Sequence, residues 1–237
     1  MTRTTAPSPS PSTRCQVCAA RQNCLIGRLP RARQVRIDPW IGEVEFHKGD
    51  TLQVEGVSTE VVRPVKLGTV MLTRQGPDGV ARPVGIVGRG HLLGQWRLLD
   101  LPTGVGAMAL SSGRVCELPA SALGGPWLQD PVFLAALHSG MAHSYSRLAD
   151  WAQIMRLRGL PRQLVATLML LEEEQGAGAV RLPSHAALAA VLNTTRESVA
   201  RTLRQLETDG FIRRIDRWHA ALSGSHRVVF DDAALKG

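Results

Sequence analysis

Glycine punctuates the first half of this 237-residue chain and restricts what that half can fold into. Between residues 35 and 123, glycines separate short runs rich in valine, leucine and isoleucine, such as TLQV and VKLGTVMLT. Runs of this length suit strands better than helices. The segment RQGPDGVAR (74–82) contains Asp-Gly, a strong signal for a hairpin turn. Many short strands at near-regular spacing predict an all-β sandwich or barrel, the alternative being an irregular β-rich domain.

The hydrophobic period changes to a helical one at about residue 131. From there to about residue 158, apolar side chains fall on the a and d positions of a heptad, as in a two-stranded coiled coil. They are Leu134, Leu137, Met141, Leu148, Trp151 and Met155, and Ser144 interrupts one d position. We predict that this helix forms a dimer seam, the alternative being an amphipathic helix that packs on its own domain. Gly159-Leu160-Pro161 breaks the pattern, and a second helix is expected over about 162–174.

The C-terminal quarter predicts two short helices joined by a tight turn. Ser184 is the expected N-cap of the first helix, and Asn193 in the turn tolerates a left-handed backbone. Thr194 and Glu197 match the Thr-x-x-Glu capping box, which would open the second helix. Gly210 then ends that helix. This arrangement is a helix-turn-helix, and two short strands at about 211–215 and 226–230 would add a wing.

In a helix-turn-helix, the first turns of the second helix enter the major groove and contact base edges. Arginine can donate two hydrogen bonds to guanine, and glutamate can accept one from cytosine. The net charge of +8 also favours a polyanionic partner. The predicted DNA-contacting residues are Thr194, Thr195, Arg196, Glu197, Ala200, Arg201 and Arg204. The alternative is a solvated helix face on which Glu197 simply pairs with Arg201.

Three of the four cysteines, Cys15, Cys18 and Cys24, lie close together near the N-terminus, and Cys116 lies far downstream. The chain has no run of eighteen apolar residues, and its first residues lack the apolar core of a secretory signal. We therefore expect a cytoplasmic protein with no membrane span. Thiols in a reducing compartment bind metals or act in redox chemistry more often than they form structural disulfides.

The order of these elements resembles the cyclic-AMP receptor/fumarate-nitrate-reductase regulator (CRP/FNR) superfamily of bacterial transcription factors. Three segments, FHKGDTLQVEG (46–56), VKLGTVMLTRQGPDGVAR (65–82) and GHLLG (90–94), are similar to its roll strands and turns. NTTRESVARTLRQLETDGFI (193–212) is similar to its recognition helix. The resemblance implies an α+β fold: an N-terminal cyclic-nucleotide-binding-like β-roll, a long dimerisation helix and a C-terminal winged helix-turn-helix. The expected divisions are a disordered lead (1–14), the cysteine segment with the β-roll sensor domain (15–130), the dimerisation helix (131–159) and the DNA-binding domain (160–237).

Within the superfamily, C-x2-C-x5-C before the roll and a fourth cysteine in VCELP are similar to the oxygen-responsive FNR branch. In that branch four thiolates hold a 4Fe–4S cluster. The implied ligands are Cys15, Cys18, Cys24 and Cys116, and zinc is the alternative because four thiolates suit it too. The implied function is a DNA-binding regulator, not an enzyme, that senses oxygen or redox state through a cluster controlling dimerisation and promoter binding. The alternatives are a structural zinc, a thiol switch or another ligand.

The resemblance also implies partners: a second copy of the chain, RNA polymerase and palindromic double-stranded DNA with TGA-containing half-sites. We expect no cyclic nucleotide. Relatives that bind one use a Gly-Glu pair and a later Arg-Ser, whereas here Gln95 follows Gly94 and segment 98–113 contains no arginine. Asn23, before the third cysteine, is polar where the best-known FNR proteins have an apolar residue, so oxygen sensitivity is expected to differ from theirs.

Overall fold

The first half of the described chain forms two antiparallel four-stranded sheets around a shared apolar core. The structure is a computed structural model that describes residues 15–176 and 178–224. The first sheet has the order β1 (Gly42–Phe46), β8 (Gly113–Pro119), β3 (Val61–Leu67) and β6 (Leu92–Leu93). The second has the order β2 (Thr51–Gln53), β7 (Gly106–Ala109), β4 (Val70–Gln75) and β5 (Ala81–Val87). The predicted β-roll is therefore confirmed.

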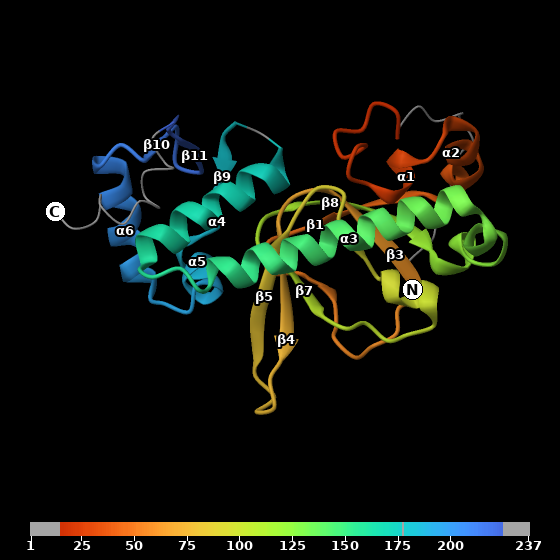
Figure 1. The fold of residues 1–237 in the computed structure, drawn as a ribbon, viewed down its shortest axis with the longest axis horizontal. Helices are drawn as coiled ribbons and strands as arrows, with labels where there is room; N and C mark the ends of the chain where they lie inside the picture. Colours follow the sequence, from red (N-terminus) through yellow and green to blue (C-terminus); the bar gives the residue numbers. More distant parts are fainter. Residues whose placement is uncertain (1–14, 177, 225–237) are drawn as a thin grey trace.

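The hairpin predicted at Asp78-Gly79 joins β4 to β5 and projects away from the body of the molecule (Figure 1). Gly79 has φ +73°, in the region that glycine enters without steric cost. Before the roll, the chain forms two helices, α1 (Leu25–Arg28) and α2 (Arg31–Ile37). Short 3-10 turns complete this region: η1 (Asp38–Trp40), η2 (Gln95–Leu99), η3 (Ala120–Leu123) and η4 (Gly125–Gln129).

Helix α3 (Pro131–Ile154) runs along the whole molecule, from α1 and α2 at one end to the C-terminal domain at the other (Figure 1). It ends four residues earlier than the apolar pattern does, so Met155 is its C-cap. Gly159 precedes α4 (Leu160–Gln175), the second predicted helix. None of the helices in 15–176 and 178–224 has the length and apolarity of a membrane span.

The apolar stripe of α3 faces its own chain, which corrects the predicted dimer seam. Leu137 is 4% exposed and packs with α1, and Trp151 is 3% exposed and packs with α4. Met141, Leu148 and Met155 are half-buried against the same chain, and Leu134 is half-buried as well. The interrupting Ser144 is also inward, with its Oγ 3.3 Å from Nδ1 of His91 in the roll. Over so few turns, a seam with period 3.5 and an inward face with period 3.6 give the same apolar spacing.

The C-terminal domain is a helix-turn-helix with a three-stranded sheet of order β10-β11-β9. Its elements are β9 (Val180–Arg181), α5 (His185–Val191), α6 (Arg196–Thr208), β10 (Ile212–Arg214) and β11 (His219–Leu222). The first predicted wing strand is confirmed as β10. Its hairpin partner is β11, earlier in the chain than predicted, and the strand predicted at 226–230 lies outside the described residues.

One buried carboxylate joins the roll, α3 and α4. Gly88 at the end of β5 donates its N–H to Oε2 of Glu174 (2.6 Å), and Nε of Arg147 on α3 lies 3.3 Å from Oε1. A side chain at Gly88 would collide with the backbone of Glu174, so glycine is required for this approach. Burial raises the pKa of Glu174 to about 7, although Gly88 and Arg147 act in the opposite direction.

We predict that Glu174→Gln changes how stability depends on pH. The folded pKa of Glu174 lies above its ordinary value of 4.5, so the stability it contributes is present below that value and is lost as pH rises through about 7. Burial and His143 lower the pKa of His91 to about 4, so the stability that His91 contributes increases as pH rises above that value. Removing Glu174 should leave stability rising more steeply from pH 5 to pH 7, by on the order of 3 kcal/mol. Urea unfolding at several pH values measures this; Glu173→Gln, an exposed neighbour, is the control, and parallel curves for Glu174→Gln and wild type would contradict the prediction.

Candidate nucleic-acid interface and four-cysteine pocket

The recognition helix α6 begins one residue later than its sequence suggested. Its N-cap is Thr195, whose Oγ1 accepts the N–H of Ser198 (3.1 Å). Thr194 belongs to the turn instead, because its N–H donates to the carbonyl of Ala189 (2.9 Å) after the left-handed Asn193 (φ +50°). The predicted capping box of Thr194 and Glu197 is thus corrected, whereas the left-handed Asn193 is confirmed.

The inner face of α6 fixes its orientation. Val199, Leu203 and Leu206 are almost fully buried and belong to one apolar cluster with α4 and α5. These positions are spaced by four and three residues, so they share one side of the helix. Ser184 caps α5 as predicted by accepting the N–H of Ala187 (3.3 Å). The opposite side of α6 is therefore held outward by the packing of the whole domain.

The predicted DNA-contacting residues lie on this outer side and at the start of the helix. Thr195, Arg196, Glu197, Arg201 and Arg204 are exposed, and Thr194 and Ala200 are half-buried. The alternative pairing of Glu197 with Arg201 is not formed among the described residues. Arg201 instead has Nη2 at 3.4 Å from Oγ of Ser198. Arg196, Glu197, Arg201 and Arg204 are thus free to meet an external partner.

Sequence reasoning missed two basic side chains near α6. His185 opens α5, and burial together with the charges of Arg214, Arg196 and Arg204 lowers its pKa. Lys48 lies in the roll but lines the same cleft as Arg196. The position of His185 after a strong N-cap was a usable signal. The sequence around Lys48 contains no such signal, because the packing of distant segments brings Lys48 beside Arg196.

The second candidate site is a narrow apolar pocket lined by all four cysteines of the chain. Cys15, Cys18 and Cys24 come from the loop before α1, and Cys116 comes from β8. Backbone turns close this loop: Arg21 donates to the carbonyl of Cys18 (3.0 Å) and Cys24 to that of Ala20 (2.9 Å). Cys24 is buried, the other three are half-buried, and none is in a disulfide. The four predicted ligands therefore meet, although no three His, Cys, Asp or Glu of the described residues are placed to hold a single metal ion.

The surroundings of Cys15, Cys24 and Cys116 favour the protonated thiol. Burial raises the pKa of Cys15 to about 11 and that of Cys116 to about 12, and it raises the pKa of Cys24 as well. The negative charges that the other thiols would carry act in the same direction. Because the thiolate is the nucleophile, a raised pKa makes Cys15, Cys24 and Cys116 poor nucleophiles at neutral pH.

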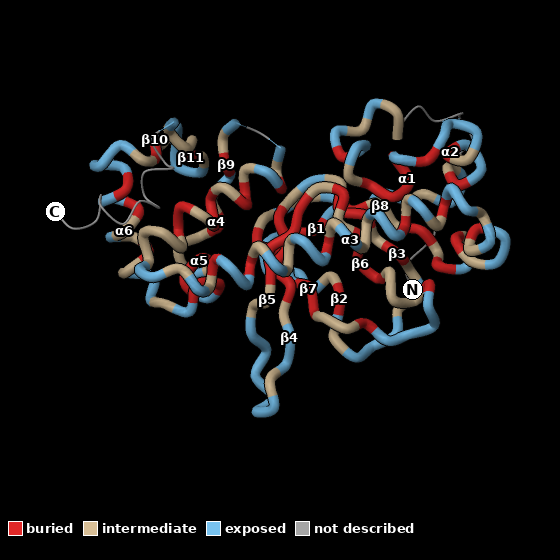
Figure 2. The backbone as a smooth tube through the Cα atoms, in the orientation of Figure 1, coloured by how far each residue is buried: buried red, intermediate tan, exposed pale blue. Residues whose placement is uncertain are grey.

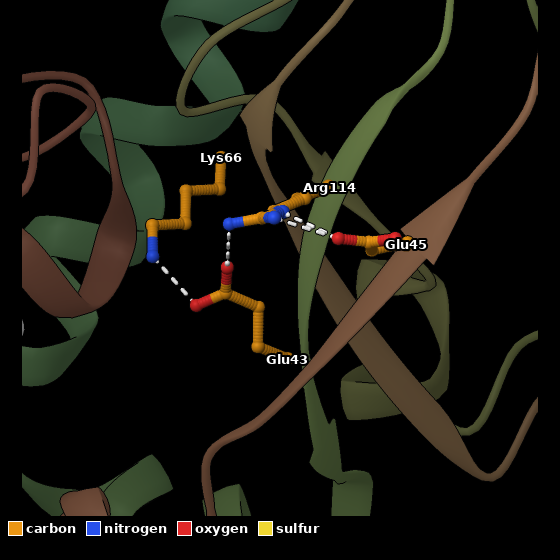
Figure 3. Close-up of polar contacts among 4 residues, drawn as sticks. All are labelled: Glu43, Glu45, Lys66 and Arg114. Atoms are coloured by element: carbon orange, nitrogen blue, oxygen red, sulfur yellow. Dashed lines mark hydrogen bonds and ion pairs between the residues drawn. The ribbon is translucent and has the colours of Figure 1, made fainter.

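Lys66 is the main cation beside the pocket, and a surface network holds it (Figure 3). Its Nζ lies 2.6 Å from Oε2 of Glu43, and Arg114 bridges Glu43 (3.4 Å) to Glu45 (2.6 Å). The charge of Lys66 opposes burial by lowering the pKa of Cys15 and Cys116. Lys66 therefore places one positive charge, paired with Glu43, at the edge of a largely apolar pocket.

The segment after the cysteines is clasped to the N-terminal half of α3. Ile26 and Leu29 share an apolar cluster with Phe133 and Leu137. Two ion-pair or hydrogen-bond contacts accompany this packing, Arg28 Nη1 to Ser139 Oγ (2.7 Å) and Arg33 Nε to Asp130 Oδ2 (2.7 Å). Asp130 also caps α3 by accepting the N–H of Val132 (2.8 Å). The cysteine pocket and the start of α3 are thus parts of one packed unit.

Comparison with known proteins gives one match to the C-terminal helix-turn-helix and several to the fold as a whole. Residues 162–222 match the Crp-like helix-turn-helix domain. No curated protein matches the chain. FixK2 from Bradyrhizobium japonicum superposes with a TM-score of 0.67 at 21% identity, over 80% of this chain and 96% of FixK2.

Two regulators from Thermus thermophilus are also similar. One is a CRP-family transcriptional regulator with a TM-score of 0.58 at 20% identity, covering 76% of this chain and 91% of the regulator. The other is a CRP/FNR-family transcriptional regulator with a TM-score of 0.57 at 23% identity, covering 79% of this chain and 96% of the regulator. At these identities the likeness establishes the fold, in which a sensor roll, a long helix and a helix-turn-helix follow in this order.

We predict that Thr195→Ala lowers the free energy of unfolding by about 1 kcal/mol, because it removes the N-cap of α6. Thr194→Ala, one residue earlier, removes no cap and should cost clearly less. Urea unfolding of both variants measures the difference. Equal losses, or a larger loss for Thr194→Ala, would show that the cap lies where the sequence pattern put it.

Proposed function

We propose that this chain is a DNA-binding transcriptional regulator of the CRP/FNR type rather than an enzyme, and that it responds to oxygen or redox state. The sensor we propose is a 4Fe–4S cluster held by Cys15, Cys18, Cys24 and Cys116. The observation that carries the proposal is that all four cysteines of the chain line one apolar pocket, although Cys116 is far from the others in sequence. Four cysteine ligands are the usual set for such a cluster.

We favour a cluster over a single zinc ion because the spacing of the three N-terminal cysteines and the distant fourth are similar to the oxygen-responsive FNR branch. The raised pKa of Cys15 and of Cys116 disfavours a bare thiol switch through these two residues at neutral pH. A cluster bound at this site would supply a redox-active group that oxygen can attack. Lys66 beside it would offset part of the negative charge of four thiolates.

The packing of α1 and α2 gives a route from the pocket to α3. With the four thiolates joined through a common group, the cysteine loop is fixed to β8 and α1 is held on α3. When they are not joined, the loop is held by the burial of Leu25, Ile26 and Leu29 and by the arginine contacts alone. The position and capping of the first turns of α3 then depend on fewer contacts. We propose that this difference alters the pairing of two α3 helices.

We propose that the dimer forms through the outer face of α3 and not through its apolar stripe. Exposed residues on this face recur with heptad spacing: Ala135, His138, Ala142, Tyr145, Ala149 and Ala152. Small side chains allow two helix backbones to approach closely, and Tyr145, 75% exposed, offers a large apolar surface. Because the opposite face is filled by the chain's own core, this face is where a second copy can pack.

A two-fold dimer of this kind would present two copies of α6 to a palindrome. We propose TGA-containing half-sites about one helical turn apart, with Arg196, Glu197 and Arg201 contacting base edges. RNA polymerase is the proposed protein partner once the dimer is bound. Bivalent binding makes occupancy steeply dependent on dimer formation, so a modest weakening of the dimer would remove the regulator from DNA.

We predict that the protein purified or reconstituted without oxygen binds about four irons and four sulfides per chain, as a 4Fe–4S cluster requires. Cys24→Ser and Cys116→Ser should lower the iron content severalfold, because each removes a thiolate. Val17→Ser is the matched control, since Val17 is 80% exposed between two of the cysteines. Visible absorption, iron, sulfide and zinc analysis are the measurements. A colourless protein with one zinc, or with no metal after anaerobic reconstitution, would reject the cluster.

We also predict that Ala142→Glu weakens the dimer at least about tenfold, because two carboxylates would face each other across a close-packed seam. The melting temperature of the chain should change little, since Ala142 is exposed. Leu137→Ala should instead lower the free energy of unfolding by about 2–5 kcal/mol, as for other buried leucines. Analytical ultracentrifugation and thermal unfolding separate the two effects, with Ala190→Glu on the exposed side of α5 as control. An unchanged dimer in Ala142→Glu would exclude this face.

A further inference from the structure

A second cleft, unrelated to the cysteine pocket, lies where the roll meets the DNA-binding domain. It encloses about 550 Å³ and is bordered by Lys48, in the turn between β1 and β2, and by the starts of α5 and α6. The wing contributes Arg214, Arg217 and Trp218. The cleft is thus built from both domains, and four of its lining residues are lysine or arginine.

The charge of this cleft is of one sign. None of its described lining residues is acidic, whereas the cleft between α3 and α4 contains Asp150 and Glu173. Of the nearby carboxylates, Glu207 lies 3.8 Å from Arg214 and offsets one of the four cations, whereas Asp50 accepts the N–H of His47 (2.7 Å). A site of this composition attracts an anion.

The positive charges around this cleft contribute to the lowered pKa of His185. Its pKa is lowered by burial and then by the charges of Arg214, Arg196 and Arg204. A phosphate in the cleft would lie among these groups and relieve their mutual repulsion. Arg217 lies against the ring of Trp218, with its guanidinium carbon 4.7 Å from the ring centroid, which holds one of the cations at the mouth of the cleft.

The elements around the cleft are those that a helix-turn-helix brings to the DNA backbone, with one exception. The first helix, the start of the recognition helix and the wing all approach a duplex together. Lys48 belongs to the sensor roll, is exposed, and makes no ion pair within the described part of the chain. No sequence pattern in the roll marks it as a DNA contact.

We propose that this cleft binds a phosphate of the DNA backbone and that Lys48 is a contact between the sensor roll and the duplex. This inference rests on the proposed function insofar as it takes the chain to bind duplex DNA, but not on the cluster or on the half-site sequence. It adds a sequence-independent contact whose availability depends on how the roll sits beside the helix-turn-helix. The roll would then contribute directly to affinity for DNA.

The test is the salt dependence of duplex binding by the full-length protein. Lys48→Gln should weaken binding roughly three- to tenfold at 0.1 M salt and should lower the slope of log K against log salt by about 0.9 per lost contact. The loss should be equal for a duplex with TGA half-sites and for a scrambled duplex of the same length, because phosphates are common to both. Lys48→Arg keeps the charge and should restore both affinity and slope.

Arg31→Gln is the matched control. Arg31 is exposed on α2, at the other end of the molecule from α6 (Figure 1), and its substitution removes the same charge. The inference is overturned if Lys48→Gln binds with the slope and affinity of wild type, or if Arg31→Gln loses as much as Lys48→Gln. If wild type neither prefers TGA half-sites nor responds to oxygen while Lys48→Gln still lowers the slope, the proposed sensing function fails and this contact stands.

Discussion

The inward face of α3 supplies side chains to each of the three apolar cores, and the arrangement of the rest of the molecule depends on it. Phe133 and Leu137 complete the core beneath α1 and α2, and Leu148 packs against the core of the roll. Trp151 and Ile154 enter the core that the roll shares with the DNA-binding domain. Figure 2 shows the alternation along this helix, with buried positions toward the sheets and exposed positions outward. A displacement of α3 along its axis would therefore disturb all three cores at once, since packed interiors tolerate little change in shape.

Polar contacts fix the register of α3 against these cores. Asp130 caps its start and is held by Arg33, Ser144 meets His91 near its middle, and Arg147 lies beside Glu174. Each contact reaches a different part of the chain: α2, the roll and the end of α4. Apolar packing alone is non-directional, whereas each of these polar contacts requires a particular orientation of its two side chains. Together they define where the sensor region and the DNA-binding domain sit along one helix.

A feature of this structure could be predicted from the sequence when the residues that form it lie close together along the chain. The Asp78-Gly79 hairpin, the Ser184 cap and the left-handed Asn193 were predictable because they depend on residues within a few positions. The start of α6 was misplaced by one residue because two adjacent threonines can both cap a helix, and the contact of Thr194 with Ala189 decides between them. The apolar stripe of α3 was predicted to face a second copy but packs on its own chain, because the partner of an apolar helix face is set by distant segments. The four cysteines were grouped by likeness to a family, and their common pocket is created by β8 packing beside the N-terminal loop.

The separation of the cores constrains how a signal at the cysteines can reach DNA. The cysteine pocket belongs to the core beneath α1 and α2, whereas α6 is anchored in the core formed by Val199, Leu203 and Leu206 with α4 and α5. No cysteine contributes to that second core, so the helix-turn-helix stays folded whether or not the four thiols are joined. A change at the cysteines can therefore act through α3, which contributes to both cores, or through the roll, which contributes Met71 and Ile86 to the core of α6. An effect confined to the first turns of α3 leaves the recognition surface of each chain intact and alters how two such surfaces are held relative to each other. Under the proposed function, this architecture favours regulation by dimer geometry rather than by unfolding of the helix-turn-helix domain.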